Sequence, residues 1–141
     1  MSNVNMSTKL PVSADIVWQT IGGFSSIAKW HPAIEKSEET TEGGATIRTL
    51  SLAGGGGTVV EKLETLNDKE RSCTYSIVSS PMPLSNYEAT LRVRADGPMS
   101  CTVEWSSKFD AEGASENDAA ATVRQAYEAG FENLKRMFGG S

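Results

Sequence analysis

The single histidine of this 141-residue chain, His31, lies between Trp30 and Pro32. An imidazole can donate or accept a hydrogen bond, and its charge changes near neutral pH, so His31 is the first candidate for site chemistry. Two interpretations stay open. His31 can be the polar head of a binding site, or it can donate to a backbone carbonyl at a helix end. A catalytic role would also require reach to a substrate proton.

Glu61 is the second candidate. In the stretch TVVEKLE it shares one strand face with Val59 and Leu63, while Val60 and Lys62 lie on the other face. Alternation therefore predicts an inward carboxylate, which is costly unless it is paired, hydrogen-bonded or protonated. Such a group in a cleft is typical of a functional site. The alternative is a twisted or bulged strand that brings Glu61 to water.

Other side chains on the apolar faces can either contact a ligand or pack in the core. Three tyrosines can each offer a hydroxyl to a ligand or pack as core: Tyr75, Tyr87 and Tyr127. The three tryptophans, Trp18, Trp30 and Trp105, are expected to pack. Arg48 alternates with Leu50 and Leu52, but the opposite face of its strand is hardly more polar, so its direction stays open. Met82, in a proline-rich turn, can touch an apolar ligand.

The elements that must position these residues follow from periodicity and from turn residues. Ser13 can cap a helix that Gly22 and Gly23 end, and Pro32 ends the next helix, so His31 lies between a helix and a strand. Period-two alternation indicates an antiparallel meander, whereas helical spacing returns near the C-terminus. In chain order we expect a strand over 3–8, helices over 13–21 and 25–30, strands across 35–110, and a long helix over 114–138.

Length and charge exclude several classes of protein. A chain of this length suits one domain, 1–141, and its 18 acidic and 13 basic residues form no basic stripe for nucleic acid. No stretch approaches the apolar length of a membrane span, and the N-terminus does not resemble a secretion signal, so we expect a cytoplasmic protein. One histidine and two cysteines, Cys73 and Cys101, imply no metal site and no disulfide framework. No cofactor is predicted.

The order and spacing of these stretches resemble the helix-grip superfamily, which includes the birch pollen allergen, START lipid-transfer domains and, more distantly, plant abscisic-acid receptors. Within it, the chain is most similar to bacterial polyketide cyclase/dehydrase-like proteins. The resemblance implies an α+β fold, in which a seven-stranded antiparallel sheet curves around a long C-terminal helix and two short helices follow the first strand. It rests on six stretches: 14–38, 43–50, 59–78, 83–93, 103–109 and 119–135.

The resemblance also implies a cavity between the sheet and the long helix. In the abscisic-acid receptors, the segment matching 30–37 supplies a cationic lysine and Glu61 matches an inward glutamate, so His31 and Glu61 should face one cavity. The histidine can serve there as a hydrogen-bond donor or, near Glu61, as a partly charged imidazolium. For Glu104 the resemblance implies an inward side chain and alternation an outward one, so Glu104 is left out of the site. The glycine run 54–57 lacks a phosphate-binding motif but can form a lid.

We therefore predict a protein that binds or transports a small hydrophobic or aromatic, lipid- or polyketide-like ligand in this cavity. The alternative is a polyketide cyclase or dehydratase with His31 and Glu61 as acid and base. No feature of the sequence favours an interaction module, and the sequence does not predict an oligomeric state. The expected ligand contacts are His31, Glu61, Tyr87, Leu50, Leu52, Tyr75, Ala89, Met82, Val123, Ala126, Tyr127 and Phe131.

Overall fold

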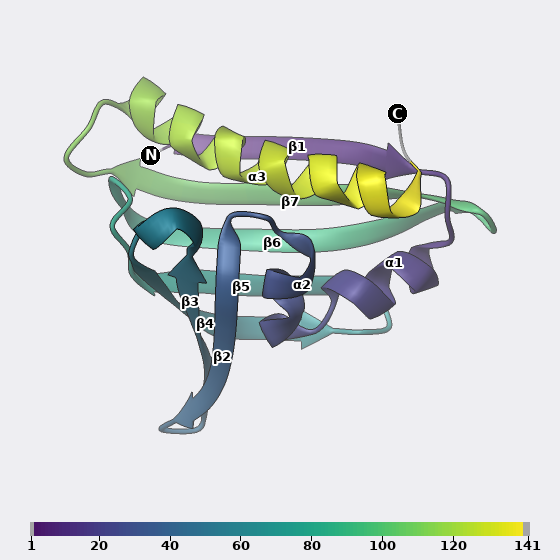
Figure 1. Cartoon of the computed structure of the whole chain (residues 1–141), viewed down its shortest axis with the longest axis horizontal. Helices are drawn as coiled ribbons and strands as arrows, with labels where there is room; N and C mark the ends of the chain where they lie inside the picture. Colours follow the sequence, from purple (N-terminus) through teal and green to yellow (C-terminus); the bar gives the residue numbers. More distant parts are fainter. Residues whose placement is uncertain (1, 140–141) are drawn as a thin grey trace.

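Seven antiparallel strands form one curved sheet, and a long helix lies across it in the computed structural model, which describes residues 2–139 (Figure 1). The strands follow the order β1-β7-β6-β5-β4-β3-β2. Strands β2 to β7 therefore form a meander, and β7, the last strand, pairs with β1, the first. The predicted helix-grip architecture is confirmed. The strands are β1 (Ser2–Leu10), β2 (Ile34–Glu42), β3 (Ala45–Leu52), β4 (Thr58–Asn67), β5 (Ser72–Ser79), β6 (Leu84–Gly97) and β7 (Ser100–Ala111).

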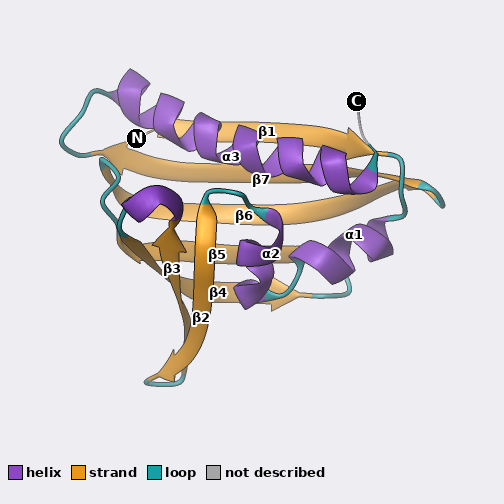
Figure 2. Cartoon of the chain, viewed as in Figure 1, coloured by secondary structure: helices purple, strands orange, loops and turns teal. Residues whose placement is uncertain are grey.

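The helices begin and end close to the predicted residues (Figure 2). The hydroxyl of Ser13 accepts from the backbone N–H of Ile16 and caps the first helix, and the hydroxyl of Ser115 caps the last in the same way. Pro32 follows the short helix that ends before His31. The helices are α1 (Ala14–Ile21), η1 (Phe24–Ser26), α2 (Ile27–Trp30), η2 (Ala53–Gly55) and α3 (Glu116–Phe138).

The core lies between the sheet and α3. Tyr127 of α3 stacks on Trp105 of β7 with ring centroids 4.1 Å apart, and Trp30 packs on the same indole. The apolar stripe of α3 buries Val123, Phe131 and other residues against the strands. This stacking fixes α3 above β7, and the sheet curves away from the helix beyond β6 (Figure 1).

Gly130 allows three ring side chains to lie close to the backbone of α3. A Cβ atom at this position would lie 3.0 Å from His31 Cδ2, 3.0 Å from Trp30 Cζ3 and 3.1 Å from Trp105 Cζ3. All three neighbours are ring atoms of buried side chains, which cannot easily yield. A glycine here therefore lets the His31 ring reach the backbone of α3.

The two cysteines are free and buried, with Cys73 on β5 and Cys101 on β7. Strand β6 lies between their strands, as the meander predicted. Burial raises the pKa of the Cys73 thiol to about 11, so the thiol stays protonated at neutral pH.

Candidate functional site

A cavity of about 340 Å³ lies between α3 and the part of the sheet formed by β3 to β7. Its wall is mostly apolar, and it includes both candidate residues, His31 and Glu61. A space of this kind, with a few polar groups in an apolar wall, is typical of a small-molecule site. Of the expected contacts, the wall contains His31, Leu50, Leu52, Glu61, Tyr75, Met82, Tyr87, Ala126 and Tyr127.

Three expected contacts do not line the cavity. Ala89, Val123 and Phe131 are buried in the packed core instead. Strand alternation and helix periodicity identify the covered face of an element, but they do not distinguish wall from solid core on that face. The wall also contains residues that were not predicted: Ile27, Ala33, Ile34, Val59, Ile77, Trp105, Thr122, Gln125 and Ala129.

His31 is held by backbone groups on both sides of its ring. Its Nε2 lies 2.7 Å from the carbonyl oxygen of Ala126, and its Nδ1 accepts from the N–H of Ala33 at 3.2 Å. A carbonyl only accepts and an N–H only donates, so the ring is neutral with its proton on Nε2. Burial lowers the pKa of His31 and the charge of Arg48 adds a smaller decrease, while the hydrogen bond to the Ala126 carbonyl acts in the opposite direction. Of the two roles left open for His31, hydrogen-bond donor or partly charged imidazolium, these contacts fit the donor.

Glu61 is inward and paired with Arg48, its direct neighbour in the register of β3 and β4. Arg48 Nε donates to Glu61 Oε1 at 2.7 Å, and Nη2 lies 2.6 Å from the same oxygen. Both side chains are buried. Burial raises the pKa of the Glu61 carboxyl, while the charge and hydrogen bonds of Arg48 act in the opposite direction.

Arg48 does not line the cavity and lies behind Glu61. Its Nη1 donates to the carbonyl oxygen of Phe24 at 2.5 Å. The guanidinium carbon lies 4.2 Å from the centroid of the Phe24 ring and 4.7 Å from that of Tyr75. The sequence contains a signal for this pair. Arg48 and Glu61 each occupy a position on the apolar face of their strand, and the two strands are adjacent.

The tyrosines extend the polar part of the wall. Tyr87 and Tyr127 share a hydrogen bond between their hydroxyl groups, and Trp105 Nε1 donates to the Tyr75 hydroxyl at 3.0 Å. Burial raises the pKa of Tyr127 to about 12 and those of Tyr75 and Tyr87 well above their ordinary value. All three phenols are therefore neutral hydrogen-bonding groups.

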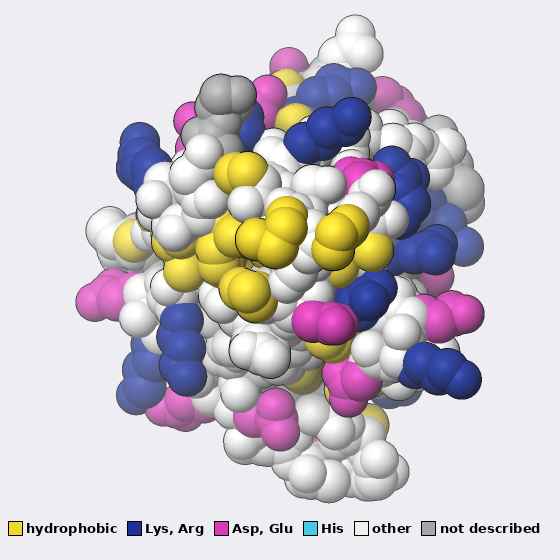
Figure 3. Space-filling view, turned by 90° about the vertical axis from the view of Figure 1, so that its right-hand side faces the viewer, with side chains coloured by type: hydrophobic (Ala, Val, Ile, Leu, Met, Phe, Trp, Pro, Cys, Tyr) yellow, Lys and Arg dark blue, Asp and Glu magenta, His cyan; other side chains and the backbone are white. Residues whose placement is uncertain are grey.

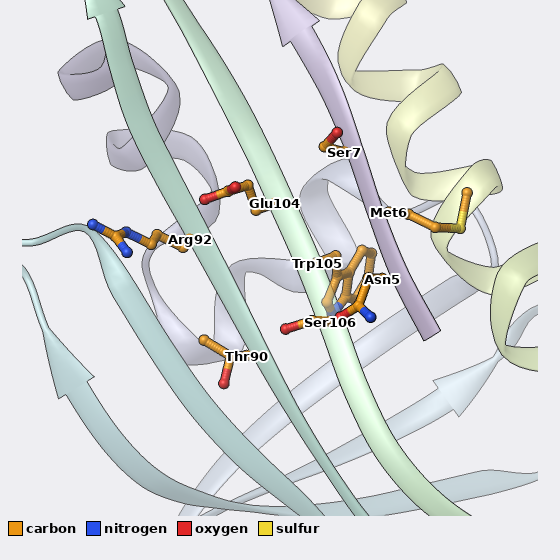
Figure 4. Close-up of a pocket in the computed structure, with 8 residues that line it drawn as sticks. All are labelled: Asn5, Met6, Ser7, Thr90, Arg92, Glu104, Trp105 and Ser106. Atoms are coloured by element: carbon orange, nitrogen blue, oxygen red, sulfur yellow. The ribbon is translucent and has the colours of Figure 1, made fainter. Parts of the chain in front are cut away.

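Glu104 lies on the outer face of the sheet, as alternation indicated, and Arg94 Nη1 donates to it at 3.0 Å. It borders a shallow depression of about 460 Å³ on β1, β6 and β7. Hydroxyl, amide and charged side chains such as Ser106 and Arg92 project into this depression (Figure 4). It is separated from the cavity by the sheet, because Trp105 turns to the opposite face and stacks on α3.

An apolar patch covers part of the end of the molecule at the right of Figure 1, and basic and acidic side chains lie around it (Figure 3). Ile16 of α1 and Met137 of α3, two elements that reach this end, are exposed. Neither residue lines the cavity. Among the described residues, no helix combines the length and hydropathy of a membrane span.

Residues 1–139 match the family described as polyketide cyclase / dehydrase and lipid transport. The chain belongs to this family. It is also similar to the solved structure of XoxI from Bacillus cereus, with 37% identity, a TM-score of 0.92, and coverage of 98% of this chain and 96% of that chain. A search of curated proteins gave no significant match.

More distant members of the superfamily share the fold alone. A START superfamily protein from Mycobacterium smegmatis has 11% identity and a TM-score of 0.80, over 97% of each chain. The Zhui aromatase/cyclase from a Streptomyces species has 16% identity and a TM-score of 0.73, over 96% of this chain and 95% of that one. The family member therefore has the START-like architecture that the sequence predicted.

Proposed function

We propose that this family member binds or transports a small, mostly apolar ligand in the cavity between the sheet and α3. The observation that carries this proposal is the cavity of about 340 Å³ with its mostly apolar wall. Each titratable side chain in that wall is either neutral or, in the case of Glu61, paired with Arg48. Apolar surface removed from water supplies binding free energy of roughly 25 cal/mol per Å² before the costs of association. A carrier needs such a wall and no reactive group.

The enzyme alternative has less support from the geometry. A cyclase or dehydratase of the predicted type would use His31 and Glu61 as acid and base. Both nitrogens of His31 are bonded to backbone groups, and Glu61 Oε1 is occupied by Arg48. Proton transfer through His31 would first have to break its two contacts, and Glu61 has only Oε2 free and, within residues 2–139, no second acid or base beside it that is not already bonded, so binding without turnover is the function that we propose.

Fluorescence titration with N-phenyl-1-naphthylamine, a neutral apolar probe, tests the proposal. Wild-type protein should bind one probe per chain. Ala126 lines the cavity, whereas Ala121 is exposed on the same helix, so they offer a matched pair of substitutions. Ala126→Phe fills part of the cavity and should weaken binding by about tenfold or more, the effect of roughly 1.4 kcal/mol. Ala121→Phe should leave it unchanged.

Equal binding by both variants, or no binding by the wild type, would overturn the proposal. Circular dichroism and thermal unfolding should show that both variants remain folded. Native mass spectrometry of gently purified protein then searches for a co-purified ligand and gives its mass.

A further inference from the structure

The cavity wall contains a carboxylate but no lysine or arginine. Glu61 lines the cavity, and Arg48, the one buried cation among residues 2–139, lies behind it. Two contacts to Glu61, one to the Phe24 carbonyl and two aromatic faces hold the guanidinium in place. Turning Arg48 toward a ligand would break these contacts and leave Glu61 buried as an unpaired charge, which is costly.

An acidic ligand would therefore find no cationic partner. Its carboxylate would have to leave water for an apolar wall and would approach the Glu61 carboxylate. Burial of an unpaired ion is strongly unfavourable. Binding of a cationic ligand is also unfavourable, because Arg48 already neutralises Glu61 and would repel a second cation.

One oxygen of Glu61 is still available. Both contacts of Arg48 go to Oε1, and Oε2 has no hydrogen-bond partner within the described part of the chain. The Tyr75 hydroxyl accepts from Trp105, and its own proton has no acceptor among residues 2–139. The cavity thus offers one strong acceptor and one donor, both on side chains that line it.

We infer that the ligand is a neutral molecule bearing a hydroxyl group, such as an alcohol, phenol or enol, which donates to Glu61 Oε2. A hydroxyl oxygen can also accept from Tyr75, whereas an amide or indole N–H can only donate. Hydrogen bonds to a charged acceptor are stronger than those between neutral groups. This inference rests on the proposed binding function and specifies the ligand class of the same site.

Four probes with one aromatic body test the inference: naphthalene, 2-naphthol, 2-methoxynaphthalene and 2-naphthoate. Near neutral pH the naphthol is uncharged and the naphthoate is an anion. Calorimetry on the wild-type protein should give a Kd for 2-naphthol at least about tenfold lower than for 2-methoxynaphthalene, the factor expected from one charge-assisted hydrogen bond. The naphthoate should bind more weakly than naphthalene itself.

A double variant removes both charges and so separates the contribution of the hydrogen bond to Glu61 from the contribution of the shape of the cavity. In Arg48→Met/Glu61→Met, two apolar side chains of similar length replace the buried pair, a change that is often tolerated. The ratio of the two affinities should fall toward one, because the hydrogen bond to Glu61 is lost while the steric difference between naphthol and its methyl ether is unchanged. Naphthalene should bind this variant within about threefold of the wild type, since a 0.6 kcal/mol change corresponds to that factor.

The outcomes distinguish the two proposals. If naphthalene binds but the naphthol and its methyl ether bind the wild type equally, or the naphthoate binds best, the hydroxyl assignment is overturned and the binding function stands. If none of the four probes binds, the binding function fails and the ligand class fails with it. An unchanged affinity ratio in the double variant would also overturn the assignment to Glu61.

Discussion

His31 Nε2 donates to the carbonyl oxygen of Ala126 at 2.7 Å and thereby joins the junction of α2 and β2 to the middle of α3. Ala126 also lines the cavity, so the chain's single histidine holds the helix that covers the cavity. The ring reaches the helix at Gly130, where no side chain intervenes. His31 is therefore both part of the cavity wall and a structural link.

Replacing His31 separates these two roles. The amide nitrogen of glutamine can take the place of Nε2, so His31→Gln should keep much of the bond to Ala126. His31→Ala loses this bond, leaves the N–H of Ala33 without its acceptor, and should lower the free energy of unfolding by about 1–3 kcal/mol. Urea unfolding measures both variants. Equal stability of the alanine and glutamine variants would contradict the structural role.

The neutral state of His31 predicts a pH dependence of stability. Because burial lowers its pKa in the folded protein below the ordinary value of 6.5, the unfolded chain binds the proton more readily. The free energy of unfolding should therefore be highest above pH 6.5 and fall as the pH drops below it, by at most about 1.4 kcal/mol per pH unit from this residue.

His31→Gln provides the control for this pH dependence. Glu61, whose raised pKa acts in the opposite direction at lower pH, is present in both proteins, so the difference between them isolates His31. Urea unfolding at a series of pH values should show a smaller slope below pH 6.5 in the variant. Parallel curves would show that His31 does not bind a proton differently on folding.

The Arg48–Glu61 pair should be much more sensitive to loss of one partner than of both. Arg48→Met leaves the Glu61 carboxylate buried without its cation and should cost about 3–5 kcal/mol. Adding Glu61→Met should restore most of this loss, because no isolated charge remains. Thermal and urea unfolding of the two singles and the double complete a mutant cycle. Strictly additive losses would contradict the pairing.

Gly130→Ala should destabilise the protein although alanine favours helices by about 1 kcal/mol. The added methyl group meets three buried rings at 3.0–3.1 Å, and overpacking of this kind costs about 1–3 kcal/mol. Glu128→Ala, at an exposed position on α3, serves as the control for helix propensity. A Gly130 variant as stable as this control would show that the rings can yield.

The sequence predicted the architecture well because local rules determine most of it. Ser13 caps α1, Pro32 prevents the continuation of α2, and alternation in β5 and β6 separates their two faces. Each signal depends on neighbours in the chain. The glycine run 54–57 forms a turn in which Gly54 has a positive φ, a conformation that glycine adopts easily. Its role as a lid stays a prediction.

The site was harder to predict because its contacts join residues far apart in the sequence. The bond from His31 to Ala126 spans 95 residues and uses a backbone carbonyl, which no side-chain pattern reveals. Alternation showed that Glu61 points inward but not that Arg48 neutralises it. Likewise, Ala89 and Tyr75 follow the same pattern and are direct neighbours in the register of β5 and β6, yet only Tyr75 lines the cavity.

A crystal structure of the protein with 2-naphthol tests the central claim most directly. We expect electron density for one naphthol between the sheet and α3, with its oxygen within hydrogen-bonding distance of Glu61 Oε2 and its rings against the wall near Ala126. Density confined to the outer depression beside Glu104, or elsewhere on the surface, with an empty cavity, would contradict this claim.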